Sequence, residues 1–134
     1  VESLDTTDKQ LTPGDSGKTF MCDQNSTADV DVFLPQMSTK IAGWNARFFM
    51  RTASSNDVHI IAYGSAAAGA TTGDSDTIVY LEEGDTNTAN LAADTLQFTA
   101  SAAAVGDWIE IFTDGSKWYA QGHAVADASI TAVG

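Results

Sequence analysis

Histidine, cysteine and clustered carboxylates are the side chains of this 134-residue chain that could do chemistry. The two histidines, His59 and His123, have no cysteine or second histidine at the spacing of a zinc site. The single cysteine, Cys22, lies in the apolar run "TFMC", where we expect a buried thiol and not a nucleophile. His59 alternates with the apolar residues of "DVHIIAY", so we expect it to be a structural residue on the polar side of a strand.

Two acidic loops, "GDSD" at 73–76 and "EEGDTN" at 82–87, offer the oxygen ligands that calcium prefers. Neither loop follows the twelve-residue EF-hand pattern, and we interpret both as solvated acidic loops. The glycines form no GxxxxGK[ST] or GxGxxG phosphate loop, and no GxSxG motif supports a Ser–His–Asp triad. The sequence therefore predicts no enzyme, no cofactor and no metal site.

Short apolar runs separated by turn residues predict an all-β protein of about nine strands, folded as a single-domain β-sandwich or jelly roll. The run "VGDWIEIFTDGSKWYAQGHA" predicts a hairpin with its turn at "DGS". Alternation places Ile109 and Ile111 on one side of the first hairpin strand, and Trp108 and Phe112 on the other. A sheet with apolar residues on both sides is covered by a second sheet or by a neighbouring subunit. The other expected strands are "KTFMCD", "DVDVFLP", "NARFFMRT", "DVHIIAY", "DTIVYLEE", "DTLQFTA" and "ASITAV", with a short helical turn in "QMSTKIAGW" that ends at Gly43.

Five aromatic residues are expected to fill the core and to form contacts between subunits. They are Trp44, Trp108, Phe112, Trp118 and Tyr119. The alternative is an exposed stacking platform formed by Trp44, Trp108 or Trp118, which would indicate a carbohydrate-binding module.

The charge balance is strongly acidic, with 18 acidic and 6 basic residues and a formal net charge of −12. A nucleic-acid-binding protein groups its basic residues on one face, whereas here they are scattered along the chain. We therefore expect neither a nucleic acid nor an anionic membrane as partner, and no apolar run approaches the length of a membrane helix. The excess charge favours solubility at high copy number.

The first residues, 1–13, are polar, lack apolar periodicity and end at a Pro-Gly break. We interpret them as an extended arm that precedes a β-sandwich domain at 14–134 and adds to the edge of a partner's sheet; the alternative is a disordered tail. The residues expected to dock this arm are Leu4, Asp5, Asp8 and Leu11.

Four segments in order, "LTPGDSGKTFMCD", "DVDVFLP", "WNARFFMR" and "GDWIEIFTDGSKWYAQGHA", resemble a module of tailed-phage structural proteins. The likeness covers roughly residues 11–132 and is most specific in its first and last segments. The module that these segments resemble is that of capsid decoration (cement) proteins and of some fibre or spike proteins.

The resemblance implies a non-enzymatic virion component present in many copies. We expect a decoration protein on the outer surface of an icosahedral head, where it bridges subunits of the major capsid protein. Resemblance also implies a homo-oligomer, with a trimer favoured. The alternative within this class is a head-fibre, tail-fibre or spike domain.

Overall fold

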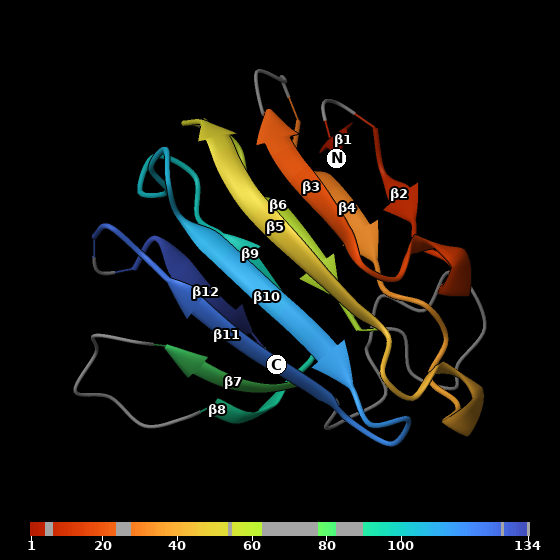
Figure 1. The fold of residues 1–134 in the computed structure, drawn as a ribbon. Helices are drawn as coiled ribbons and strands as arrows, with labels where there is room; N and C mark the ends of the chain where they lie inside the picture. The colour runs from red at the N-terminus through yellow and green to blue at the C-terminus, as the bar shows by residue number, and fades with distance from the viewer. Residues whose placement is uncertain are drawn as a thin grey trace.

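Two β-sheets packed face to face make up the described part of the chain (Figure 1). The computed structural model describes residues 1–4, 7–23, 28–53, 55–62, 78–82, 90–126 and 128–133. The sheet nearer the viewer in Figure 1, which we call the front sheet, has seven strands, and the back sheet has five. The front sheet has the order β1 (Glu2–Leu4), β3 (Lys18–Asp23), β5 (Asn45–Thr52), β10 (Trp108–Thr113), β11 (Trp118–His123), β7 (Ile78–Glu82) and β8 (Asn90–Ala93). The back sheet has the order β12 (Ile130–Val133), β9 (Thr95–Phe98), β6 (Val58–Ile61), β4 (Val30–Phe33) and β2 (Lys9–Gln10), and two 3-10 turns, η1 (Pro13–Asp15) and η2 (Thr39–Ile41), lie in the connections.

The first six strands alternate between the two sheets and wind as a flattened coil. Strands β1, β3 and β5 are parallel neighbours in the front sheet, and β2, β4 and β6 are parallel neighbours in the back sheet. Parallel neighbours need a long crossover connection. Here each crossover contains a strand of the opposite sheet. Because β2, β4 and β6 are parallel, their N-terminal ends lie at the same end of the back sheet.

The later strands extend both sheets mainly by antiparallel pairing. Strand β10 pairs antiparallel with β5 and with β11, and β9 pairs antiparallel with β6 and with β12. The expected hairpin is confirmed as β10 and β11, in which Phe112 lies opposite Tyr119. Strand β7 is the exception, because it runs parallel to β11.

Inward side chains from both sheets form one apolar core. Ile109 and Ile111 are fully buried on β10, while Trp108 and Phe112 point outward, as the alternation predicts. At the centre, the rings of Phe20 and Phe48 stack with centroids 5.3 Å apart. This ring contact joins the neighbouring strands β3 and β5 of the coiled half of the chain.

The all-β class and the two-layer arrangement are confirmed, and every strand that the sequence predicts is present. The short turn η2 lies within the expected helical segment, and Gly43 follows it with a φ of 87°. Strands β1, β2 and β8 are not among the predicted strands. Strands β1 and β2 have three and two residues, too few to show an alternation, and β8 ("NLAA") contains one large apolar residue. A jelly roll is built from antiparallel strands, and the parallel pairs of the coil do not fit that description.

The interpretation of residues 1–13 as an arm separate from the domain is wrong. Strand β1 pairs with β3 and strand β2 pairs with β4, so this segment adds one strand to each sheet. Leu4 and Leu11, expected to anchor the arm on a capsid, are 4% and 1% exposed and belong to the core. One inward leucine is enough to bury so short a strand, and a single leucine leaves no periodic signal in the sequence.

The other two residues expected to dock the arm have different outcomes. Asp5 lies outside the described residues. Asp8 is exposed, and its Oδ1 accepts a hydrogen bond of 3.0 Å from the backbone N–H of Asp31 on β4. It is thus engaged with its own back sheet.

Four charged side chains link the sheets at the edge formed by β1 and β2. Lys9 on the back sheet forms an ion pair with Glu2 on the front sheet, and its ammonium lies 5.7 Å from the centroid of the Phe20 ring. Lys18 pairs with Glu2 at 3.3 Å and with Asp15 at 2.6 Å. These charges cover the end of the apolar core where each sheet has a free edge.

Replacing Leu11 by Ala is expected to lower the free energy of unfolding by about 2–5 kcal/mol, because it leaves a cavity in the core. Deleting residues 1–12 is expected to prevent cooperative folding. Urea denaturation followed by tryptophan fluorescence measures both effects. Gln36→Ala, at an exposed position, is the control and should change stability by less than about 0.5 kcal/mol. An unchanged unfolding midpoint for L11A would contradict the position of Leu11.

Asp15 is expected to make stability fall in acid. The Lys18 ammonium, followed by the N–H and hydroxyl of Thr12, lowers the pKa of Asp15 from 3.8 to about 2. Because the folded state depresses this pKa, the carboxylate stabilises the fold above about pH 4 and loses that effect as the pH falls toward 2, a contribution of at most about 2 kcal/mol.

The measurement compares urea unfolding of the wild type with that of Asp15→Asn between about pH 5 and pH 2. The difference in stability between the two proteins should shrink as the pH falls. A difference that stays constant over this range would show that Asp15 is not stabilised as a carboxylate.

Candidate functional site

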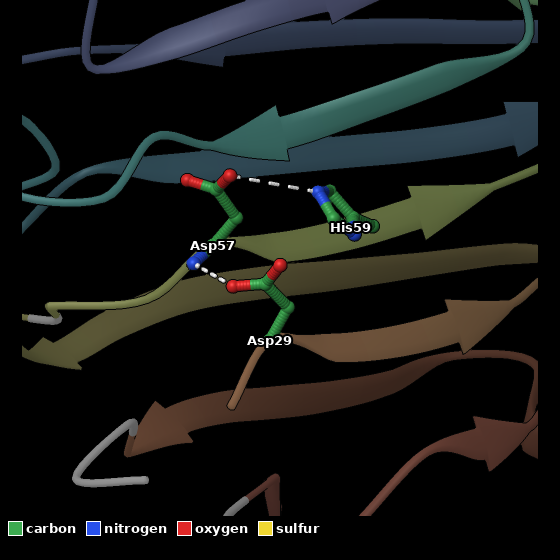
Figure 2. A group of neighbouring side chains, drawn as sticks. All are labelled: Asp29, Asp57 and His59. Atoms are coloured by element: carbon green, nitrogen blue, oxygen red, sulfur yellow. Dashed lines mark hydrogen bonds and ion pairs between the residues drawn. The ribbon is translucent and has the colours of Figure 1, made fainter. Parts of the chain in front are cut away.

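The parallel pairing of β4 and β6 brings a carboxylate–imidazole cluster together on the outer side of the back sheet (Figure 2). Asp29 and Asp57 immediately precede these two strands, which begin at the same edge, so their side chains lie next to each other. His59 follows Asp57 by two residues and therefore points to the same side of the sheet. One ligand atom from each of Asp29, Asp57 and His59 lies within 4.8 Å of the others.

Hydrogen bonds engage each member of this cluster. The backbone N–H of Asp57 donates to Asp29 Oδ1 at 3.0 Å, as Figure 2 shows, and the N–H of Ala100 donates to Asp57 Oδ1 at 2.5 Å. His59 uses both ring nitrogens: Nδ1 lies 2.8 Å from Asp31 Oδ1, and Nε2 lies 3.8 Å from Asp57 Oδ2. The expected placement of His59 on the polar side of its strand is confirmed.

Three aspartates make the same kind of hydrogen bond at the end of the back sheet where β2, β4 and β6 begin. Asp8 precedes β2 and accepts the N–H of Asp31, Asp29 precedes β4 and accepts the N–H of Asp57, and Asp57 precedes β6 and accepts the N–H of Ala100. Each carboxylate thus reaches one step along the back sheet and satisfies a backbone donor of the next segment. We call these three residues the aspartate ladder.

A buried aspartate does the same work at the start of β10. Asp107 is fully buried, and its carboxylate accepts the N–H of Ala104 at 2.7 Å and the N–H of Val125 at 2.7 Å. This role of Asp107 is not among the sequence-based predictions. The signal that could have revealed it is an aspartate directly before an apolar run, as in "DVDVFLP", "DVHIIAY" and "DWIEIF".

The chemistry open to the cluster of Asp29, Asp57 and His59 is limited by these bonds. Carboxylates and imidazole are ligands of zinc and other divalent cations. A cation there would share Asp29 and Asp57 with the backbone donors that they accept, and His59 with Asp31. The hydrogen bonds give all three side chains a structural role without an ion, and the absence of a metal site remains a prediction.

The five aromatic residues singled out in the sequence separate into two groups. Trp44 and Trp118 are 3% and 0% exposed, and their rings meet edge to face with centroids 5.3 Å apart. Trp108, Phe112 and Tyr119 instead lie on the outer side of the front sheet. Burial therefore excludes Trp44 and Trp118 from an exposed sugar-binding platform, and Trp108 is the one tryptophan of the three on the outer side.

The outer side of β5, β10 and β11 carries two pairs of aromatic rings. Phe49 and Trp108 are 6.4 Å apart between centroids, and Phe112 and Tyr119 stack at 5.3 Å and 20°. Phe112 is 47% exposed. Stacked neighbours turn their ring faces toward each other, which is a poor arrangement for a sugar that must stack on an open face. We call this surface the aromatic face and define it by these four rings.

The turn at "DGS" is a structural turn that also holds Tyr119 in place. Asp114 Oδ1 accepts bonds from the N–H of Lys117 and from the N–H and hydroxyl of Ser116, and these bonds lower the pKa of Asp114. Tyr119 donates its hydroxyl to Asp114 Oδ2 at 3.1 Å, which raises the pKa of Tyr119. Gly115 has a φ of 91°, and a Cβ there would meet Thr39 Cα at 3.0 Å.

The remaining candidates from the sequence lie apart from this cluster or outside the described side chains. Cys22 is fully buried, and burial raises the pKa of its thiol to about 12, so it stays protonated. His123 is exposed at the end of β11. The two acidic loops at 73–76 and 82–87 lie outside the residues whose side chains are described.

Comparison with known proteins adds no family: no protein-family model, no curated protein and no solved structure matches this chain. Among the described residues there is no helix with the length and apolar character needed to span a lipid bilayer.

Asp57→Ala is expected to destabilise the protein by about 1–3 kcal/mol, because it leaves the Ala100 N–H without its acceptor. Asp57→Asn keeps an amide oxygen at that position and is expected to cost clearly less. Thermal unfolding in buffer with EDTA measures both. Repeating it with calcium or zinc tests the metal prediction: a cation that raises the melting temperature of the wild type but not of D57A would show a metal site here.

Proposed function

We propose that this chain is a structural protein of a phage virion, and specifically a decoration protein on the outer surface of the head. In this proposal it binds the major capsid protein, bridges neighbouring capsid subunits and associates with further copies of itself, as a trimer according to the resemblance. It is not an enzyme and uses no cofactor.

The observation that carries the proposal is the aromatic face. The four rings gather on one outer surface, where Phe112 is 47% exposed and the other three are half-buried. An apolar patch of this kind is often a functional contact surface. Three of the four segments that carry the resemblance form β3, β5 and the β10–β11 hairpin, which are neighbours in the front sheet. The segments on which the likeness rests therefore build the surface that is suited to contact with another protein.

The charge and the polar clusters agree with this proposal. A formal charge of −12 is unfavourable for binding DNA and suits a position outside a shell that encloses it. In the described residues, the carboxylate–imidazole cluster is engaged in hydrogen bonds that hold the strands in place. Many copies that each bury a modest area would together stabilise a shell.

Particles of the phage that encodes the chain, purified on a density gradient and reconstructed by cryo-electron microscopy, test the proposal. We expect the chain to be a particle protein with density on the outer surface of the head. Heads assembled without the chain should bind the purified protein and resist higher temperatures afterwards, while heat-denatured protein serves as the control. Density at a tail or a fibre would favour the fibre or spike alternative, and absence from the particle would contradict both.

A further inference from the structure

The outward side chains of the front sheet form three rows that run across β5, β10 and β11. The two outer rows contain the aromatic rings, and the middle row is polar. In Figure 1 this surface is turned to the viewer, and no described strand lies in front of β5 or β10. By register, the rows are Phe49, Trp108 and His123; then Arg47, Glu110 and Gln121; then Asn45, Phe112 and Tyr119.

Charge on this surface is balanced, in contrast to the rest of the molecule. Arg47 donates to Glu110 at 3.1 Å in the middle row, and Arg51 forms an ion pair with Asp23 beside the first row. Both arginines of the chain are on this face, each beside a carboxylate, so the formal charge of −12 resides elsewhere. Two copies of this acidic protein therefore repel each other least when they meet here.

We infer that the aromatic face is a contact between two copies of this chain, packed front sheet to front sheet about a twofold axis. An axis parallel to the strands and between β5 and β10 sets β5 of each copy over β10 of the other. Arg47 then lies over the second copy's Glu110, and Phe49 lies over the second copy's Trp108. The pattern is self-complementary, as an isologous interface requires, and aligned sheets commonly pack in this way.

The proposed function includes association of the chain with further copies of itself, and this contact is the surface that we assign to that association. Its location in a virus particle rests on the proposed function. Its twofold symmetry differs from the trimer that the resemblance implies, and the measured mass separates the two. The four strands that overlap about this axis are β3, β5, β10 and β11. At a spacing of about 4.8 Å and a length of about 18 Å they give a face of roughly 350 Å². Standard interfaces bury about twice that area per partner, so we expect a weak dimer. Salt should strengthen it by screening the net charge.

Sedimentation velocity over a concentration series tests the inference on the intact chain. The wild type should form a dimer whose dissociation constant falls as sodium chloride is raised. Arg47→Glu and Glu110→Arg should each weaken the dimer about tenfold or more, because each places like charges opposite each other twice in the symmetric contact.

Mixing the two variants is the decisive arm of the experiment. An equimolar mixture of R47E and E110R restores opposite charges across the interface, whereas the pair within each copy stays like-charged. The mixture should therefore recover a heterodimer close in affinity to the wild-type dimer. Lys40→Glu, an exposed residue of η2, makes the same change in net charge as R47E away from this face and should leave dimerisation nearly unchanged.

Each other outcome counts against the inference. A wild type that stays monomeric at all concentrations, or a trimer that none of these variants affects, would overturn it, and so would a mixture that fails to recover the dimer. Thermal unfolding checks that the variants fold, and Phe112→Ser at its exposed position is the substitute if a charge variant does not. Binding of the chain to phage heads is measured in a separate experiment. The dimer can therefore be found when head binding fails, and head binding can be found when the dimer is absent.

Discussion

The fold depends on satisfying backbone N–H groups at the edge where the strands of the coil begin. Parallel strands that start at one end of the sheet bring several donors together there. The Ala100 donor is partly buried, and loss of its acceptor costs about 1–3 kcal/mol, whereas the Asp31 and Asp57 donors are exposed. The aspartate ladder of Asp8, Asp29 and Asp57 meets this requirement, because each carboxylate accepts an N–H of the next segment. Asp107 performs the same function for two loops beside β10. Carboxylates at the strand ends therefore join neighbouring segments of the back sheet and two loops beside β10, and the apolar core holds the two layers together.

This requirement changes the meaning of the acidic composition. The charge of −12 first indicated solubility and the exclusion of nucleic acid, which are properties of the whole surface. In the structure, several of the carboxylates are parts of the fold, and the few cations are placed with them. Lys9 and Lys18 lie at the β1–β2 edge, and both arginines lie on the outer side of the front sheet. Four of the six basic residues therefore lie at the β1–β2 edge or on the outer side of the front sheet, each paired with a carboxylate.

The strands that the sequence reveals are those of four or more residues in which large apolar residues recur. Strands β5 and β10 each place three inward side chains in the core, and their outward residues are distinct in type. Strands β1 and β2 hold too few residues to show a period, and a polar N-terminal segment was therefore interpreted as an arm. The parallel order of the coil is set by contacts between distant segments, which no local pattern records. The cluster of Asp29, Asp57 and His59 depends on the parallel pairing of β4 and β6, so it could not be predicted from local sequence patterns.

The tryptophans show why residue type does not settle whether an aromatic residue packs or binds. Trp118 and Tyr119 are adjacent on β11, and alternation sends the first into the core and the second to the aromatic face. Asp114 then fixes the Tyr119 hydroxyl at the end of the hairpin, which leaves the ring stacked on Phe112. The hairpin is therefore scaffold on its inner side, and its outer side is the contact surface in our proposal. Because the inner side of the hairpin is already filled by the core, further burial of its outer rings has to come from a second surface. The proposed contact with another copy would supply one whose charges match those between the rings.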